Sequence, residues 1–493
     1  MLRDIVAIFR DPLGYLATVR AEFGPVVAFP TQPTRAWFVD DPDAVDRVLR
    51  TNAGNYTKKT VQYGALSLLT GNGLLTADNP QWLPRRRQVG PAFHRRTLDR
   101  LVGCVGAAAD GLDAEFASRV SGAGGTGATP TRVDVDGPLM RATLDVVSRG
   151  LFSADLGRRE VTADLGRRGE NADLGRREVT ADLGRRGENA DLGRREVTAD
   201  LGRRGENDIA GAVLDGLEEV MRRATRPLHA PRSWPTPGNR RLTRSLATLD
   251  AAVDAVVTSR AGAPTPADPD VLDLLLATLG DDPRAIRDEA VTLVVAGHET
   301  VASAMEWAAH LLATHPEVQD RTAEEAARVL GDRDQPPTLA DVARLPLARA
   351  VLDETLRLYP PAWVVTRRAT ADDELAGHRL PAGTLVIVSP WVRHRDPAAW
   401  DEPSAFDPGR FLDHDHDPDT DARPTRPTGA YLPFGIGPRL CVGRDFALLE
   451  ATLLLARLTL RWRLAPVPGH RVLPNPRVTV RPRGGLPLLV SPR

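Results

Sequence analysis

A glycine-rich loop around one cysteine constrains this chain more than any other feature. Residues 432–447 read LPFGIGPRLCVGRDFA, and Cys441 is one of only two cysteines in 493 residues. Gly435, Gly437 and Gly443 let the backbone approach a flat, bulky group closely. The apolar run that follows predicts a long helix whose N-terminus lies near Cys441, where the helix dipole favours an ionised sulfur. A thiolate in this setting is suited to binding a metal ion.

Other roles for this cysteine can be compared with the metal-ligand role. A four-cysteine zinc site is excluded, because only Cys104 accompanies Cys441 in the sequence. A nucleophilic cysteine needs a base close by, and no signature of such a site surrounds the loop. A buried structural cysteine is the common case for a single residue of this type. The other motifs of the chain decide between the structural and the ligand role.

Length, charge and hydropathy set the limits of the function. A chain of 493 residues can bury a large core as one big domain or as two ordinary ones. Its net charge of −1 provides no basic field for nucleic acid. Two cysteines make no disulfide framework and fit a reducing compartment. The longest apolar runs fall short of the ~20 residues that span a bilayer, and the charged N-terminus does not resemble a signal peptide. We therefore expect a cytoplasmic protein with no membrane span.

Hydrophobic periodicity predicts a mainly α fold with a small β part. Helical patterns cover most of residues 41–120, 135–152 and 208–360. Strands are predicted in three places: two within residues 25–39, a strand–turn–strand over 375–390, and a hairpin over 477–493 that turns at Gly484 and Gly485.

Residues 154–207 interrupt this pattern with a tandem repeat. Two nine-residue units, ADLGRREVT and ADLGRRGEN, alternate over six copies. Nine residues are two and a half helical turns, so the leucines of successive units would point to opposite sides of a helix. Each unit also carries a glycine and builds no shared apolar face. The repeat is therefore predicted to be an exposed insertion in one large domain that covers residues 1–493.

Three further motifs accompany the cysteine loop. They are AGHET (residues 296–300) inside an apolar helix, ETLR (354–357), and WLPRRR (82–87). ETLR places Glu354 and Arg357 at i, i+3, and WLPRRR places Trp82 and Arg86 at i, i+4, so each pair lies on one face of its helix. With the pattern Phe-Gly-x-Gly-x-Arg-x-Cys-x-Gly at Cys441, and in this order, the chain resembles the cytochrome P450 family from about residue 10 to its end.

The resemblance implies the fold and the cofactor of that family. The fold is a single haem-binding domain, mainly α with a small β part. The cofactor is haem b, with Cys441 as the axial thiolate ligand of the iron. The other residues that the resemblance assigns to haem or to bound dioxygen are Phe434, Gly435, Gly443, Ala296 and Gly297, together with the propionate partners Trp82, Arg86, Arg367 and Arg439.

The resemblance also implies the catalytic and supporting groups. Thr300 would hydrogen-bond dioxygen, while Glu299 would help to deliver protons. Glu354 and Arg357 would meet Arg410 of the segment FDPGRF in a structural triad that supports the haem loop. Family members usually carry Glu or a similar residue where Gly409 stands, which is a mild departure. The implied activity is a haem-thiolate monooxygenase that inserts one oxygen atom from O2 into an apolar small molecule.

Electron supply and substrate follow from the same resemblance. The chain has no flavin-binding or iron–sulfur signature, so we expect a separate ferredoxin with an NAD(P)H-dependent ferredoxin reductase, or another flavoprotein. Arg444 could help to dock an acidic partner, and we expect a monomer. The segment PPAWVVTRR resembles that of bacterial oxidases of terpenoid biosynthesis, which favours a terpene-like substrate. The expected pocket residues are Val295, Ala362, Trp363, Val364 and Val365.

Several alternatives remain open at this point. Fatty-acid and polyketide hydroxylases of the family have similar sequences. A haem-thiolate peroxygenase would use peroxide and need no electron partner, and the pair Glu299 and Thr300 argues against it. A non-catalytic haem sensor is disfavoured because the motif for oxygen activation is complete.

Overall fold

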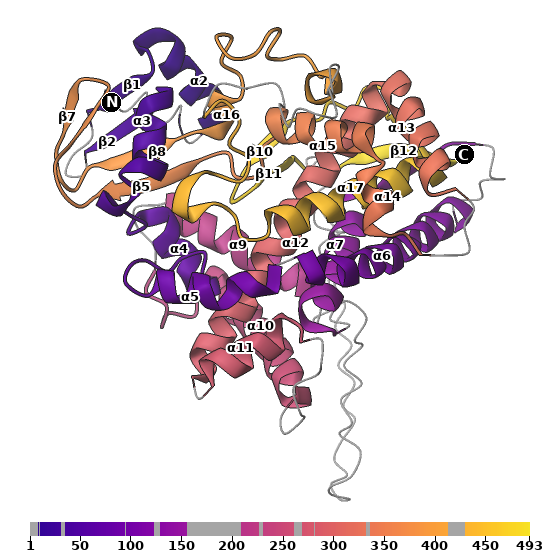
Figure 1. Cartoon of the computed structure of the whole chain (residues 1–493), viewed down its shortest axis with the longest axis horizontal. Helices are drawn as coiled ribbons and strands as arrows, with labels where there is room; N and C mark the ends of the chain where they lie inside the picture. Colours follow the sequence, from indigo (N-terminus) through magenta and orange to yellow (C-terminus); the bar gives the residue numbers. More distant parts are fainter. Residues whose placement is uncertain are drawn as a thin grey trace, which may run out of the picture.

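Helices make up most of the molecule, and the strands form a smaller part of it (Figure 1). The structure is a computed structural model that describes residues 8, 10–30, 35–93, 95–122, 129–154, 209–225, 230–260, 269–280, 282–331, 336–412 and 429–493. Apart from Ala154, the predicted repeat insertion lies outside these residues. In the part of the chain that is described, no helix is both long enough and apolar enough to cross a bilayer.

The helices agree with the predicted mainly α class. The α-helices are α2 (Pro12–Phe23), α3 (Pro42–Asp46), α4 (Val61–Thr70), α5 (Trp82–Val89), α6 (Arg95–Gly122), α7 (Asp136–Phe152), α9 (Ile209–Thr225), α10 (Pro237–Arg260), α11 (Val271–Leu279), α12 (Pro283–Thr314), α13 (Pro316–Val329), α14 (Leu339–Ala343), α15 (Pro346–Leu358), α16 (Pro390–Arg393) and α17 (Arg444–Arg461). Short 3-10 or π turns are η1 (Arg47–Thr51), η2 (Ala53–Asn55), η3 (Gly90–Phe93), η5 (Pro408–Phe411) and η6 (Gly437–Arg439).

The strands form one larger sheet and three small ones. They are β1 (Val26–Phe29), β2 (Ala36–Val39), β3 (Tyr56–Thr57), β4 (Thr131–Asp134), β5 (Val365–Ala369), β6 (Asp373–Leu375), β7 (His378–Leu380), β8 (Leu385–Val388), β9 (Trp462–Pro466), β10 (Pro474–Pro476), β11 (Val480–Pro482) and β12 (Pro487–Pro492). The larger sheet has the order β1-β2-β8-β5-β3, so it joins the N-terminal strands to a segment more than 300 residues away.

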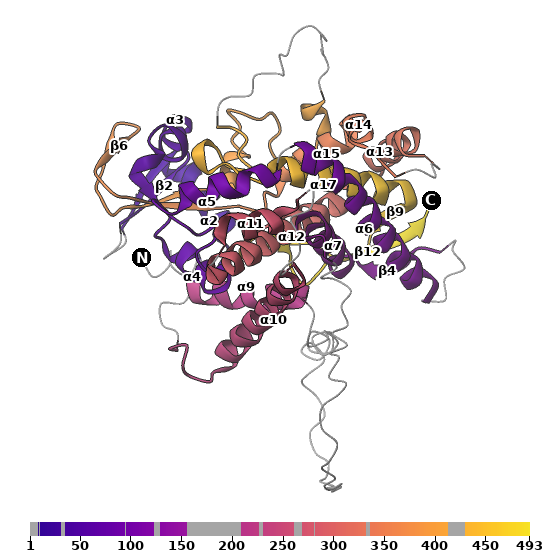
Figure 2. The ribbon, with the colours of Figure 1, turned by 60° about the horizontal axis from the view of Figure 1, so that its bottom comes forward.

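Helix α12 is the central element of the helical part. Its N-terminus is capped by Asp282, whose carboxylate accepts the Ala285 N–H at 3.0 Å, and Pro283 occupies its first turn. Apolar side chains surround most of the helix, as expected for a helix buried on nearly all sides. Figures 1 and 2 show α12 in the middle of the helical layer, and it packs against α7, α15 and α17.

Most of the predicted elements are confirmed. The two strands within residues 25–39 are β1 and β2, and the helix predicted over 135–152 is α7. The segment 375–390 differs in detail, because β6 and β7 form a hairpin that turns at Ala376 and Gly377 before β8 begins.

The predicted C-terminal hairpin is wrong. Gly484 and Gly485 do adopt left-handed backbone angles, with φ of 82° and 91°. The strands on either side nevertheless belong to different sheets, since β11 pairs with β10 while β12 lies between β4 and β9. Both edges of β12 are therefore already paired. The Asp134 carboxylate accepts the Leu486 N–H at 2.9 Å and fixes this arrangement.

Candidate active site around Cys441

The cysteine loop is held in shape by its glycines. Gly435 and Gly437 have φ of 70° and 71°, a conformation that side-chain-bearing residues rarely adopt. A Cβ atom at Gly437 would also collide with the Leu49 carbonyl. The Cys441 N–H donates to the Phe434 carbonyl at 3.0 Å and closes the loop. Phe434 packs against the main hydrophobic core, so the cysteine has a fixed position just before α17.

The Cys441 thiol lies in a setting that suits a metal ligand. The side chain is accessible to solvent, yet surrounding protein desolvates the thiol and raises its pKa. A backbone hydrogen bond from Gly443 and the positive charges of Arg86 and Arg444 act in the opposite direction and favour the thiolate. A bound metal cation would complete the ionisation. The donor set therefore fits a haem iron.

The WLPRRR motif and the cysteine loop meet through two side chains. The Arg439 guanidinium lies over the Trp82 ring, 4.0 Å from its centroid. It donates to the Ala77 carbonyl at 2.7 Å and to Asp78 at 3.1 Å. Burial lowers the pKa of Arg439 to about 10. Arg86, one turn after Trp82, is half-buried and near enough to Cys441 to interact electrostatically.

Buried basic groups gather beside this contact. Arg367 on β5 donates to the Thr366 carbonyl at 2.9 Å and weakly to the Tyr63 hydroxyl at 3.4 Å. Lys58 donates to the Leu75 carbonyl at 2.7 Å. Burial, and then the charges of Arg367 and Arg439, lower the pKa of Lys58 well below its usual value. Such a cluster of mutually repelling cations is suited to anionic groups such as haem propionates.

Lys58 was missed by sequence reasoning, although a signal was available. Lys58 and Lys59 are the only lysines in a chain whose other basic residues, apart from histidine, are arginine. A retained lysine in so biased a composition is a candidate for a specific role.

The AGHET motif lies where α12 becomes less buried. Ala296, Gly297 and Thr300 are partly exposed, whereas most of this helix is buried. The Thr300 hydroxyl donates to the Ala296 carbonyl at 2.8 Å, which is the i−4 back-bond of helical threonines. The Thr300 hydroxyl oxygen keeps lone pairs that can accept a further hydrogen bond. A Cβ atom at Gly297 would lie 2.9 Å from Val147 Cγ2, so this glycine also permits close packing on α7. The roles of these residues toward dioxygen stay predictions.

Glu299 is tied to the C-terminal segment. Its buried carboxylate accepts the Thr479 hydroxyl at 2.8 Å and pairs with Arg481 at 3.2 Å. Sequence reasoning missed Arg481, because nothing local distinguishes it from the other arginines of the chain.

The five expected pocket residues are not gathered in one cluster. Val295 belongs to the main core, and Ala362 is exposed. Trp363 is buried in a separate core cluster and donates its indole N–H to the Arg477 carbonyl at 2.8 Å. Val364 packs against that cluster, whereas Val365 begins β5 and packs against a third cluster. Trp363 is therefore a buried core residue whose indole N–H is hydrogen-bonded.

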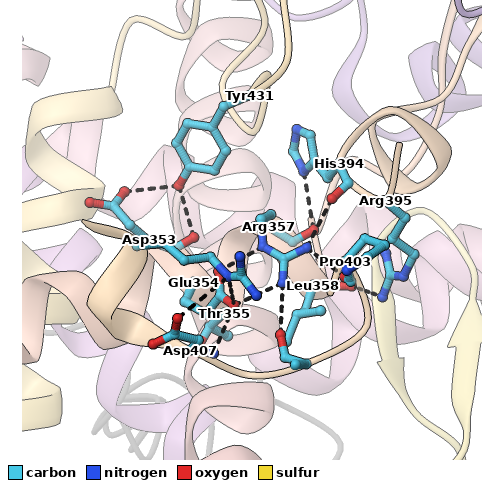
Figure 3. A network of polar contacts seen from close by, with 12 residues as sticks. Asp353, Glu354, Thr355, Arg357, Leu358, His394, Arg395, Pro403, Asp407 and Tyr431 are labelled. Carbon is cyan, nitrogen blue, oxygen red and sulfur yellow. Dashed lines mark hydrogen bonds and ion pairs between the residues drawn. The ribbon is translucent and has the colours of Figure 1, made fainter. Parts of the chain in front are cut away.

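The structure brings the predicted structural triad together, and Figure 3 shows its Glu354 and Arg357. Arg357 binds Glu354 through two hydrogen bonds of 2.6 and 2.8 Å, and both side chains are fully buried. Arg410 lies 3.4 Å from the same carboxylate. Arg357 also donates to the carbonyls of His394, Pro403 and Ala405, so the loop after α16 is attached to α15.

His394 links this triad to the cysteine loop (Figure 3). Its Nε2 accepts the Leu432 N–H at 2.7 Å, which places the ring proton on Nδ1, 3.2 Å from the Arg357 carbonyl. Burial lowers the pKa of His394 to about 3, so the ring is neutral.

A cavity of about 770 Å³ adjoins the loop. Phe434, Gly435 and Leu440 line it from the loop. Arg50, Arg349 and Arg444 also line it, each with more than two fifths of its side chain exposed.

Comparisons with known proteins identify the family of this chain. The sequence profile of the family described as Cytochrome P450 matches residues 8–171 and 198–488. Cyclooctat-9-en-7-ol 5-monooxygenase of Streptomyces melanosporofaciens is 32% identical over 100% of this chain and 94% of its own length. Pentalenene oxygenase of Streptomyces avermitilis is 32% identical over 96% and 91%. The crystal structure of CYP175A1 from Thermus thermophilus has a TM-score of 0.68 and 30% identity, and the match covers 99% and 96% of the two chains.

Proposed function

The chain belongs to the cytochrome P450 family and is a cytochrome P450 monooxygenase; on that premise we propose that it uses haem b bound through Cys441 to oxygenate a terpene-like hydrocarbon. The observation that carries the site is the Cys441 loop, which combines left-handed glycines, a hydrogen bond to the sulfur and nearby guanidinium groups. The haem, when bound, would supply the dioxygen chemistry, which a thiolate ligand favours.

The chain's own residues hold and orient this group. Cys441 supplies the iron ligand. Trp82, Arg86, Arg367 and Arg439 would hold the propionates, and Phe434, Gly435 and Gly443 would shape the loop that receives the haem. Lys58 joins this set by its position beside Arg367 and Arg439. Ala296 and Gly297 leave room on α12 for dioxygen.

Thr300 and Glu299 manage protons in this proposal. The Thr300 hydroxyl, oriented by its bond to the Ala296 carbonyl, accepts a hydrogen bond or donates one at the oxygen site. Glu299 carries protons toward Thr300. A group that delivers protons must be able to exchange its hydrogen-bond partners. Thr479 and Arg481 are the partners that Glu299 would exchange.

The substrate class rests on the relatives. Two of them are named for oxygenation of cyclooctat-9-en-7-ol and of pentalenene. We extend that chemistry to this chain as an apolar, terpene-like substrate. A fatty-acid or polyketide hydroxylase is the alternative within the same reaction class.

Electrons come from a separate acidic partner. The cavity beside the loop is bordered by Arg50, Arg349 and Arg444, each paired with a neighbouring aspartate. An acidic protein could bind there by exchanging those aspartates for its own carboxylates. A ferredoxin with an NAD(P)H-dependent reductase, or another flavoprotein, has the required chemistry. We also propose that the enzyme is a cytoplasmic monomer; its two free cysteines fit a reducing compartment.

The ligand assignment is tested by carbon monoxide binding. The reduced wild-type protein should show the strongly red-shifted Soret band of thiolate ligation, because the thiolate pushes charge onto the iron. Cys441→His should lose that band, while Cys104→Ser serves as the matched control and should keep it. A wild-type band typical of histidine ligation would overturn the assignment.

The monooxygenase is separated from a peroxygenase by Thr300→Ala. With a redox partner present, this variant should still bind haem and substrate but divert electrons into peroxide. Product yield per electron should fall roughly tenfold or more, the scale of one positioned proton-delivery group. Thr314→Ala, a back-bonded threonine at the end of the same helix, is the control. Equal product yields from the wild type and Thr300→Ala would remove Thr300 from the mechanism.

A further inference from the structure

Behind Glu299 lies a buried cluster in which three carboxyl groups share one guanidinium. Arg481 on β11 pairs with Glu299 at 3.2 Å and approaches Glu306 through Nε at 3.4 Å. Its Nη2 donates to both Glu306 and Asp136. The Glu299 and Glu306 side chains are 6% and 1% exposed, whereas that of Asp136 is 26% exposed. The cluster therefore reaches from the interior beside Thr300 toward solvent.

The charges of this cluster do not balance if every group is ionised. One positive charge and three negative ones would leave a net charge of −2 in a mostly buried space. Like-charged carboxylates in contact retain a proton, because an uncompensated buried charge is costly. Glu306 is the most buried of the three and is hydrogen-bonded to Asp136. Burial raises the pKa of Glu306 well above its ordinary value, and the charge of Asp136 acts in the same direction.

Neighbouring groups fix the cluster without neutralising it. Ser303 and Trp307 of α12 both donate to the Val480 carbonyl at 2.7 Å and so anchor the residue before Arg481. Thr479 donates to Glu299. Asp134 brings a further negative charge nearby, but its carboxylate accepts the N–H groups of Leu486 and Asp136.

We propose that Asp136 and Glu306 share one proton, and that this proton sets how strongly Arg481 holds Glu299. While the pair keeps the proton, Arg481 can also compensate the Glu299 carboxylate. When the pair releases the proton to solvent through Asp136, two negative charges draw Arg481 toward the pair and free Glu299 to take up a proton. Asp136, Glu306 and Arg481 are then positioning residues for Glu299. The inference rests on the proposed role of Glu299 in proton delivery.

The shared proton is tested in the resting protein, independently of turnover. Infrared spectra should show the carbonyl band of a buried protonated carboxylic acid at pH 7. Glu306→Gln should remove the Glu306 band and leave that of Glu450, another fully buried carboxyl group whose pKa burial raises well above its ordinary value. Asp136→Asn should keep the Glu306 band but move its loss on alkaline titration downward by at least about one pH unit, because a neighbouring negative charge is gone. Asp145→Asn, which cuts only the surface pair with Arg149 on the same helix, should leave the titration unchanged.

The link to Glu299 is tested by the yield of product per electron as a function of pH. The alkaline midpoint of this profile should move down with the infrared midpoint in Asp136→Asn. In Glu306→Gln the alkaline transition should be lost, since the amide imitates the protonated acid at every pH. A missing Glu306 band in the wild type overturns the shared proton. If the infrared band of a variant moves while its pH profile of product per electron matches that of the wild type, the shared proton does not control Glu299. A protein that makes no product with any redox partner would instead refute the proposed function, and the infrared result would stand.

Discussion

The buried histidine between the structural triad and the cysteine loop makes a quantitative prediction about acid stability. His394 is fully buried and neutral, and its two ring nitrogens both have backbone partners, Leu432 N–H and the Arg357 carbonyl. Burial lowers the pKa of His394 from 6.5 to about 3. The unfolded chain therefore binds a proton at a pH at which the folded protein does not.

The sign and the size of the effect follow from this difference. The stabilising contribution is complete above the unfolded pKa of 6.5 and is lost as the pH falls toward 3. Because the unfolded histidine is already half-protonated at pH 6.5, a fall of two units from there should cost the wild type about 2.3 kcal/mol of unfolding free energy through His394 alone. The loss should level off near pH 3.

The informative substitution is His394→Gln, which keeps an acceptor for Leu432 but cannot titrate. At neutral pH it should cost about 1–3 kcal/mol, because the Arg357 carbonyl loses a donor. Between pH 6.5 and 4.5, however, the variant should lose about 2.3 kcal/mol less than the wild type.

The assay is urea unfolding of haem-loaded protein, followed by circular dichroism at pH 6.5, 5.5 and 4.5. The difference between variant and wild type removes the contributions of all other titrating groups. His378→Gln, at an exposed position on β7, should follow the wild type at every pH. If the wild type and His394→Gln lose stability in parallel, the folded protein already binds a proton at His394 and the argument from burial is refuted.

Two further changes test other parts of the chain. Burial raises the pKa of Asp40 from 3.8 to about 6, so folding favours the protonated carboxyl group and the protein loses stability as the pH rises between these values. In the same urea series, Asp40→Asn should gain roughly 3 kcal/mol of unfolding free energy relative to the wild type between pH 4 and 7. A difference between the two proteins that stays constant with pH would contradict this. We also propose that the tandem repeat is expendable, because the family profile matches nothing between residues 171 and 198. Deletion of residues 163–207 should leave the carbon monoxide band and the midpoint of thermal unfolding unchanged. Loss of haem binding in this variant would show that the repeat is needed.

Much of the candidate site could be predicted because its signals are local. Gly435 and Gly437 need left-handed backbone angles, and Glu354 and Arg357 need only a helix to bring them together. The prediction of a C-terminal hairpin was wrong because strand pairing is not determined locally. Gly484 and Gly485 have the backbone angles of a tight turn, but strand pairing depends on which edges are free, and β4 and β9 occupy both edges of β12.

The charges that control Glu299 show why the remainder could not be predicted. The motif AGHET identifies Glu299 as a carboxylate beside Thr300, whereas its partner Arg481 lies 182 residues later. Nothing in the sequence distinguishes this arginine from the others of an arginine-rich chain. The charge of a buried carboxyl group is set by the groups within a few ångströms of it, whatever their distance along the chain. A local motif can therefore name a candidate proton carrier, whereas the charges around that residue depend on the packing of β11 against α12.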